Sequence, residues 1–122
     1  MEHAVLVVDD DRDIRDTLIE MLEEHGYRAA GAANGRDALA VLGTSPHPPC
    51  LILLDLMMPV MDGRGFREEQ LKNPEWAQIP VIVISAYSDA QAQARALDLP
   101  CMRKPLGMRP LIEVVQRHCR GA

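Results

Sequence analysis

The sequence predicts an α/β fold in which five parallel strands alternate with five helices. Three continuous apolar runs, at residues 4–8, 50–54 and 80–84, are rich in Val, Ile and Leu. Runs of this kind are typical of strands that are buried on both faces. Apolar residues recur at helical spacing between the runs, bounded by capping residues and glycine. Alternation of strands and helices indicates a parallel sheet with helices on both faces.

The first two strand–helix units can be placed from their boundary residues. The strand over 4–8 leads into a helix that Asp11 is expected to cap and that ends near Gly26. Residues 28–31 form a weaker strand, and Asn34 opens the second helix. Both helices carry apolar residues on one face and therefore pack against the sheet.

The third unit joins the strand over 50–54 to a helix from Asp62 to about Lys72. We expect this helix to turn Phe66 and Leu71 toward the core, because both are apolar.

The last two units follow the strand over 80–84. Ser88 or Asp89 begins an alanine-rich helix that reaches about residue 97. A short strand at 100–102 and an amphipathic helix over 108–119 complete the pattern. We expect the strand order 2-1-3-4-5, the flavodoxin-like arrangement, in a single domain over residues 1–122.

Composition excludes several classes of protein. The net charge is −5, whereas a nucleic-acid-binding face must be basic. No apolar run approaches the roughly 20 residues that a membrane span needs. No signal peptide is visible after Met1, so we expect a cytoplasmic protein.

The cysteines and histidines suggest no site of their own. Three cysteines are an odd number and lie far apart in the sequence, so we expect small buried thiols and no disulfide or metal site; they are Cys50, Cys101 and Cys119. The four histidines fall at the N-terminus, helix ends and a loop, so we expect surface positions for them; they are His3, His25, His47 and His118.

Polar residues follow the predicted strands at the ends where ligands bind in such sheets. Asp9 and Asp10 end the first strand, Asp55 the third and Ser85 the fourth, and Lys104 follows the fifth. We expect these side chains to meet at one edge of the sheet.

Crowded carboxylates need a counter-charge, and oxygen ligands without His or Cys favour Mg²⁺. A carboxylate nucleophile beside a hydroxyl and an ammonium suits an aspartyl-phosphate.

Four motifs resemble the receiver domain of two-component response regulators, and the resemblance covers essentially the whole chain. They are Val7–Asp11, Leu54–Gly63, Ile82–Ala86 and Lys104-Pro105. The resemblance implies a signalling domain that catalyses only its own phosphotransfer and dephosphorylation. Its expected donor is a phosphohistidine of a histidine kinase or of a histidine phosphotransfer protein.

The resemblance also implies roles for individual residues. Asp55 would be the phosphoacceptor, with Mg²⁺ held by Asp9, Asp10, Asp55 and the backbone carbonyl of Met57. Ser85 would be the switch hydroxyl. Lys104 would bind a phosphoryl oxygen and precede Pro105 in a cis peptide bond.

The sequence departs from the family pattern at three places. Cys101 stands where most receivers carry Tyr or Phe. Compared with the family pattern, the turn before the fifth strand, at 97–100, is shorter, and the segment that leaves the third helix, at 71–76, is longer. We therefore hypothesise that Tyr87 is the mobile aromatic residue and that, together with Met57, it narrows the path of attacking water.

The departures at Cys101 and at 97–100 fall on the face formed by the fourth helix, fifth strand and fifth helix. Receivers commonly dimerise or meet partners there, so a homodimer through this face is a further expectation.

Other interpretations remain open. A phosphatase or phosphotransferase with an aspartyl-phosphate intermediate would need a carboxylate at position 57, where this chain has Met57. A pseudo-receiver would bind a partner without phosphorylation. The chain is either a stand-alone receiver or part of a larger kinase or regulator, and Met1 favours the former.

Overall fold

Five parallel strands form one sheet in the order β2-β1-β3-β4-β5, so the expected fold class and strand order are confirmed. The computed structural model describes residues 4–86 and 90–119. No helix in this part of the chain is long and apolar enough to cross a membrane. The strands are β1 (Ala4–Val8), β2 (Arg28–Ala32), β3 (Leu51–Asp55), β4 (Val81–Ser85) and β5 (Cys101–Arg103). The helices are α1 (Arg12–Glu24), α2 (Gly35–Thr44), α3 (Gly63–Lys72), α4 (Pro74–Ala77), α5 (Ala90–Ala96) and α6 (Met108–His118).

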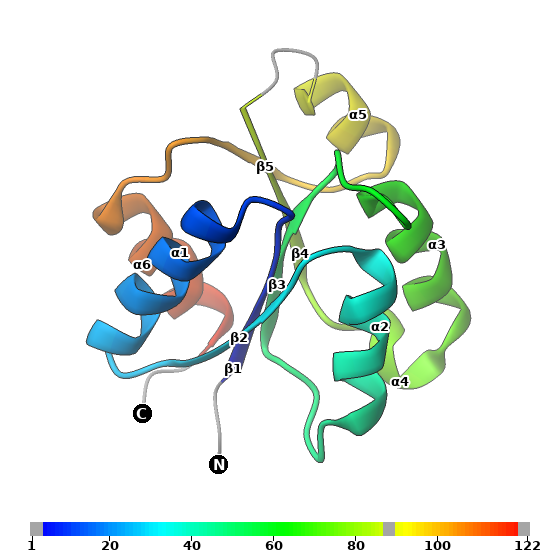
Figure 1. Cartoon of the computed structure of the whole chain (residues 1–122), viewed down its shortest axis with the longest axis horizontal. Coiled ribbons are helices and arrows are strands. Elements are labelled where there is room, and N and C mark those ends of the chain that lie inside the picture. Colours follow the sequence, from blue (N-terminus) through cyan, green and yellow to red (C-terminus); the bar gives the residue numbers. More distant parts are fainter. Residues whose placement is uncertain (1–3, 87–89, 120–122) are drawn as a thin grey trace.

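The sheet lies between two layers of helices. Helices α1 and α6 cover one face, and α2, α3, α4 and α5 lie on the other (Figure 1). Successive residues of a strand point to opposite faces, so Val5 and Val7 pack with the first layer while Leu6 and Val8 pack with the second. Every residue of β3 and β4 is buried, as the continuous apolar runs predict.

Side-chain caps fix where the helices begin next to the strand ends. Oδ1 of Asp11 accepts hydrogen bonds from the backbone N–H groups of Asp13 at 3.0 Å and Ile14 at 3.2 Å. Asn34 and Asp62 cap α2 and α3 in the same way. The predicted helix starts at these three residues are therefore confirmed.

The inward face of α3 differs from the prediction at one position. Phe66 is fully buried as expected, but Leu71 is 52% exposed. Gln70 takes the inward place, because it lies four residues after Phe66 on the same helix face. Its Nε2 donates to the backbone carbonyls of Trp76 at 2.9 Å and Ile79 at 3.1 Å. This buried amide therefore fastens the extra turn α4, which the sequence showed only as a longer exit.

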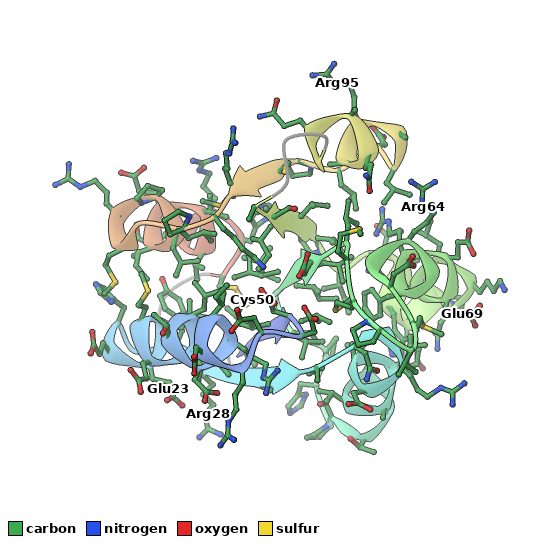
Figure 2. All side chains as sticks on the ribbon, turned by 45° about the horizontal axis from the view of Figure 1, so that its top comes forward. Glu23, Arg28, Cys50, Arg64, Glu69 and Arg95 are labelled. Atoms are coloured by element: carbon green, nitrogen blue, oxygen red, sulfur yellow. A yellow bond between two sulfur atoms is a disulfide. The ribbon has the colours of Figure 1, made fainter. Side chains whose placement is uncertain are left out.

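The expectation of three separate thiols is wrong, because Cys50 and Cys119 form a disulfide (Figure 2). Their Cα atoms lie 5.4 Å apart although the residues are 69 positions apart in the chain. Packing of α6 on the sheet brings its end to the start of β3, a proximity that spacing alone does not reveal. Cys101 is a free thiol.

The expected surface positions are confirmed for three histidines. His25, His47 and His118 are exposed, and His3 lies outside the described residues.

Candidate functional site

The carboxyl ends of the parallel strands bring the predicted polar residues to one edge of the sheet. Asp9 and Asp10 directly follow β1, and Asp55 is the last residue of β3. Ser85 is the last residue of β4, and Lys104 directly follows β5. Because β1 and β3 are neighbours, the three carboxylates converge.

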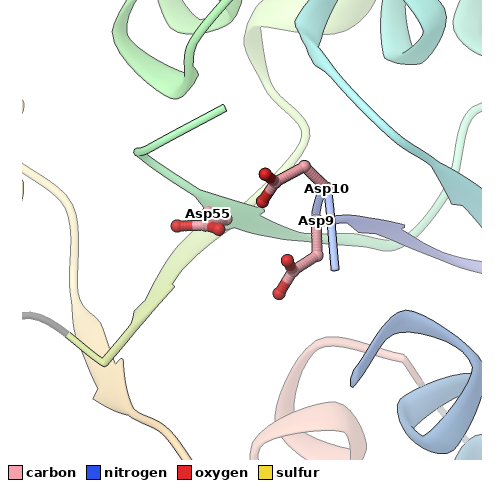
Figure 3. A group of neighbouring side chains, drawn as sticks. All are labelled: Asp9, Asp10 and Asp55. Atoms are coloured by element: carbon pink, nitrogen blue, oxygen red, sulfur yellow. The ribbon is translucent and has the colours of Figure 1, made fainter. Parts of the chain in front are cut away.

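The three carboxylates form a tight cluster. Each of Asp9, Asp10 and Asp55 offers one oxygen, and these oxygens lie within 4.8 Å of one another. Figure 3 shows the side chains of Asp9 and Asp10 at the end of β1, beside Asp55. Asp9 and Asp55 are buried, whereas Asp10 is exposed. The cluster is thus open to solvent on the side of Asp10.

Lys104 supplies the counter-charge that the cluster needs. Its Nζ lies 2.5 Å from Oδ2 of Asp9 and 3.3 Å from Oδ2 of Asp55. Burial by itself lowers the pKa of Lys104, but the hydrogen bond to Asp9 and the charge of Asp55 outweigh it, so the pKa is raised above its usual value. The ammonium therefore stays charged over the working pH range. The Lys104-Pro105 peptide bond is cis.

The surroundings of Asp55 change the acidity of its carboxyl group. Burial raises the pKa of Asp55 from 3.8 to about 6, although the N–H of Met57 and the charge of Lys104 act in the opposite direction. The negative charge of Asp9 adds to the rise. A buried carboxylate with a raised pKa beside a cation is a common feature of functional sites.

The loop after β3 holds Asp55 through main-chain contacts. The N–H of Met57 donates to Oδ1 of Asp55 at 3.2 Å, and the N–H of Gly63 donates to the carbonyl of Leu56 at 3.1 Å. A Cβ atom at Gly63 would lie 2.6 Å from the carbonyl oxygen of Asp55, so only glycine fits there. Val60 takes a φ of 68°, a strained conformation for a β-branched residue. The loop is therefore tightly folded against the end of β3.

A pocket of about 290 Å³ opens above the cluster. Its lining comes from the carboxyl ends of four strands, β1, β3, β4 and β5, and the segments that follow them; it consists of Asp9, Asp10, Asp11, Ile14, Asp55, Met57, Ala86 and Lys104. Met57 is 52% exposed at its rim. Ser85 is only 2% exposed, so its neighbour Ala86 reaches the pocket surface instead.

The donor set fits a hard divalent cation. Carboxylate oxygens are ligands that Mg²⁺ prefers, and the lining residues in the described part of the chain include no imidazole or thiol. The exposed carboxylate of Asp10 leaves room for water ligands, which Mg²⁺ usually keeps.

One predicted residue, Cys101, is not brought into the cluster, and a second falls on a part of the chain that is not described. Tyr87 lies outside the described residues. Cys101 lies in β5 and lines a separate hollow of about 230 Å³ with Gln91, Arg95 and Leu99. Burial raises the pKa of the Cys101 thiol, so it is a poor nucleophile there.

One contact at the site was missed from the sequence. Nη1 of Arg15 donates to the backbone carbonyl of Asp9 at 2.8 Å. The signal that could have found it is position, since Arg15 lies one turn into the helix that leaves the acidic pair.

Comparisons with known proteins agree with this geometry. The family model described as "Response regulator receiver domain" matches residues 5–116. An uncharacterised 14.6 kDa protein of Leptolyngbya boryana is 36% identical over 118 residues, which cover 94% of this chain and 88% of that protein. The probable transcriptional regulator ycf27 of Cyanidium caldarium is 36% identical over 98% of this chain, which spans only 47% of that regulator.

Solved structures show the same likeness. The chemotaxis protein CheY4 of Vibrio cholerae superposes with a TM-score of 0.84 and 26% identity, covering 97% of this chain and 99% of that one. The receiver domain of a histidine kinase from Syntrophus aciditrophicus gives a TM-score of 0.81 and 31% identity, covering 94% of this chain and 88% of that chain.

Proposed function

Because the chain belongs to the response regulator receiver domain family, we propose that it accepts a phosphoryl group on Asp55 in a two-component phosphorelay. The observation that carries this proposal is the joint placement of three carboxylates and one ammonium. Oxygens of Asp9, Asp10 and Asp55 lie within 4.8 Å of one another, and Lys104 pairs with both Asp9 and Asp55.

In this proposal the carboxylate of Asp55 is the nucleophile. One of its oxygens attacks the phosphorus of a phosphohistidine, the N–P bond breaks, and the imidazole leaves with the bonding electrons. Mg²⁺, held by Asp9, Asp10, Asp55 and the carbonyl of Met57, would neutralise charge on the phosphoryl oxygens. Burial keeps Asp55 poorly solvated and favours its reaction with an electrophile.

Lys104 and Ser85 act on the product. The ammonium of Lys104 is 3.3 Å from Oδ2 of Asp55, within reach of a phosphoryl oxygen attached there. Ser85 is buried at the end of β4, so its hydroxyl must turn toward the phosphoryl group to bond it. That movement would be the switch that changes partner binding.

The proposed partners follow from this chemistry. The phosphodonor is a histidine kinase or a histidine phosphotransfer protein, and the whole of residues 1–122 acts as one receiver domain. The face formed by α5, β5 and α6 is the proposed surface for a homodimer or an output partner.

The test is phosphorylation by acetyl phosphate with Mg²⁺, followed by intact-mass spectrometry. The wild-type protein gains one phosphoryl group and Asp55→Ala gains none. Asp10→Ala is phosphorylated slowly because it loses a metal ligand, whereas Asp13→Ala, an exposed acidic residue in α1, behaves like wild type. A phosphorylated Asp55→Ala protein would contradict the assignment. A wild-type protein that binds its partner without phosphorylation would indicate a pseudo-receiver.

A further inference from the structure

The side chain of Arg15 runs back along α1 to the acidic pair that follows β1. Its Nη1 donates to the backbone carbonyl of Asp9 at 2.8 Å, and the residue is half-buried. Arg12, one turn earlier on the same helix, has an exposed side chain that pairs with the exposed Asp16 at 3.7 Å. Arg15 therefore differs from its neighbouring arginine in bonding directly to the acidic pair.

A glycine in β2 provides the space for the stem of Arg15. A Cβ atom at Gly31 would lie 2.9 Å from Cδ of Arg15 and 3.1 Å from its Cγ. Gly31 pairs with Val7 in the neighbouring strand, two residues before Asp9. The methylene groups of Arg15 therefore lie directly on the main chain of β2. They can take this path because Gly31 has no side chain.

The contact of Arg15 completes a set of restraints around Asp9. On one side the N–H of Asp9 donates to the carbonyl of Ala32 at 3.0 Å. The carboxylate accepts the N–H of Asp11 at 2.9 Å and pairs with Lys104. The carbonyl of Asp9 belongs to the peptide plane that leads to Asp10. By bonding this carbonyl, Arg15 fixes the direction in which the exposed Asp10 leaves the strand.

We propose that Arg15 is a positioning residue for the cation site: it holds the Asp9–Asp10 peptide plane so that the carboxylate of Asp10 faces that of Asp55. This inference rests on the proposed function, since it assigns Arg15 to the Mg²⁺ site of the same reaction. The probe that tests it is Mg²⁺ alone, without a phosphodonor.

Charge and positioning predict opposite results for the loss of Arg15. A guanidinium near three carboxylates repels a divalent cation, so by charge alone its removal would strengthen Mg²⁺ binding. Loss of positioning weakens binding instead. Arg12→Met removes the same charge from the first turns of α1 without touching the site, so it measures the effect of charge.

The experiment measures the Mg²⁺ dissociation constant by calorimetry and the melting temperature of each metal-free variant. Arg15→Met is expected to raise the dissociation constant by about tenfold, the lower end of what loss of a partner behind a metal ligand costs. Arg12→Met leaves it unchanged or lowers it. Arg15→Lys keeps the charge but loses the planar geometry, so it recovers the affinity only in part.

A second variant perturbs the same contact without changing charge. Gly31→Ala displaces the stem of Arg15 and is expected to weaken Mg²⁺ binding in the same direction. Gly43→Ala is its matched control, because a Cβ atom there meets nothing within 4 Å. Saturating Mg²⁺ restores the phosphorylation rate of Arg15→Met, and the melting temperature of the metal-free variant shows whether the substitution also lowers stability.

The outcomes separate this proposal from the proposed function. If Arg15→Met binds Mg²⁺ as tightly as Arg12→Met, Arg15 has no positioning role, although Asp55 is still phosphorylated. If wild type neither binds Mg²⁺ nor accepts a phosphoryl group, both proposals fail.

Discussion

The ammonium of Lys104 lies nearer to Asp9 than to Asp55, at 2.5 Å from Oδ2 of Asp9 and 3.3 Å from Oδ2 of Asp55. In this arrangement Lys104 neutralises the buried carboxylate of Asp9 and only partly that of Asp55. A divalent cation and Lys104 therefore compete for the same oxygens.

Removal of Lys104 should consequently strengthen Mg²⁺ binding while weakening the metal-free fold. In Lys104→Met two buried carboxylates lose their counter-charge, at a cost of about 3 kcal/mol in metal-free stability. The measurement is denaturant unfolding with and without saturating Mg²⁺, which should recover most of this loss. Arg103→Met, an exposed neighbour, is the control and should change neither quantity. Weaker Mg²⁺ binding by Lys104→Met would contradict the competition.

The raised pKa of Asp55 makes the stability of the metal-free protein depend on pH. Because the pKa is about 6 in the fold and 3.8 in a model peptide, the folded state holds the proton more tightly. Stability is therefore fully present below pH 3.8 and is lost as pH rises toward 6, by on the order of 3 kcal/mol at most.

Asp55→Asn has no carboxylate to ionise, so it should be more stable than wild type at pH 7.5 and similar to it at pH 3.5. Melting temperatures without metal at the two pH values measure the difference. An equal pH dependence of the melting temperature in both proteins would show that ionisation of Asp55 does not cause the loss of stability.

The bond between Cys50 and Cys119 should stabilise the fold by restricting the unfolded chain. Loop closure over a separation of 69 residues corresponds to about 4 kcal/mol. A thiol reductant should therefore lower the denaturant midpoint of wild type. Cys119→Ala should start at the lower midpoint and be insensitive to reductant, while Cys101→Ala should respond as wild type does. A wild-type midpoint that reductant leaves unchanged would argue against the bond.

Met57 should slow the loss of the phosphoryl group, because its half-exposed side chain stands at the rim of the pocket. Met57→Asn opens the path of water, and a barrier lower by about 1 kcal/mol would shorten the lifetime about fivefold. The lifetime is followed by the decay of phosphorylated protein after removal of the donor. Leu71→Asn is the control, since Leu71 is as exposed as Met57 and lies in α3, outside the loop that holds Asp55. Tyr87→Ala tests the other residue of this hypothesis and should also shorten the lifetime of the phosphorylated protein.

Most of the fold could be predicted because the decisive residues act locally. The buried strands are continuous apolar runs, and Asp11 and Asp62 cap the helices that follow. The inward face of α3 could not be predicted from hydropathy alone. Gln70 is buried because its amide bonds to main-chain carbonyls of α4 and the segment after it, and these contacts form only when the chain folds. Leu71, more apolar, is left outside.

The candidate site likewise has a part that the sequence predicts and a part that depends on tertiary packing. The carboxylates could be placed because strand ends in a parallel sheet share one edge. The contact of Arg15 with Asp9 and the bond between Cys50 and Cys119 depend on how α1 and α6 pack, which no local pattern specifies.

Gly63 packs closely against the main chain of Asp55, so the absence of a side chain at residue 63 matters for the site. The carbonyl oxygen of Asp55 and the Cα of Leu56 occupy the space that any Cβ at residue 63 would need, at 2.6 Å and 2.8 Å. Both obstacles are main chain, so no rotamer change can make room. Any replacement of Gly63 therefore has to shift the end of β3, so a residue without a side chain constrains the position of Asp55.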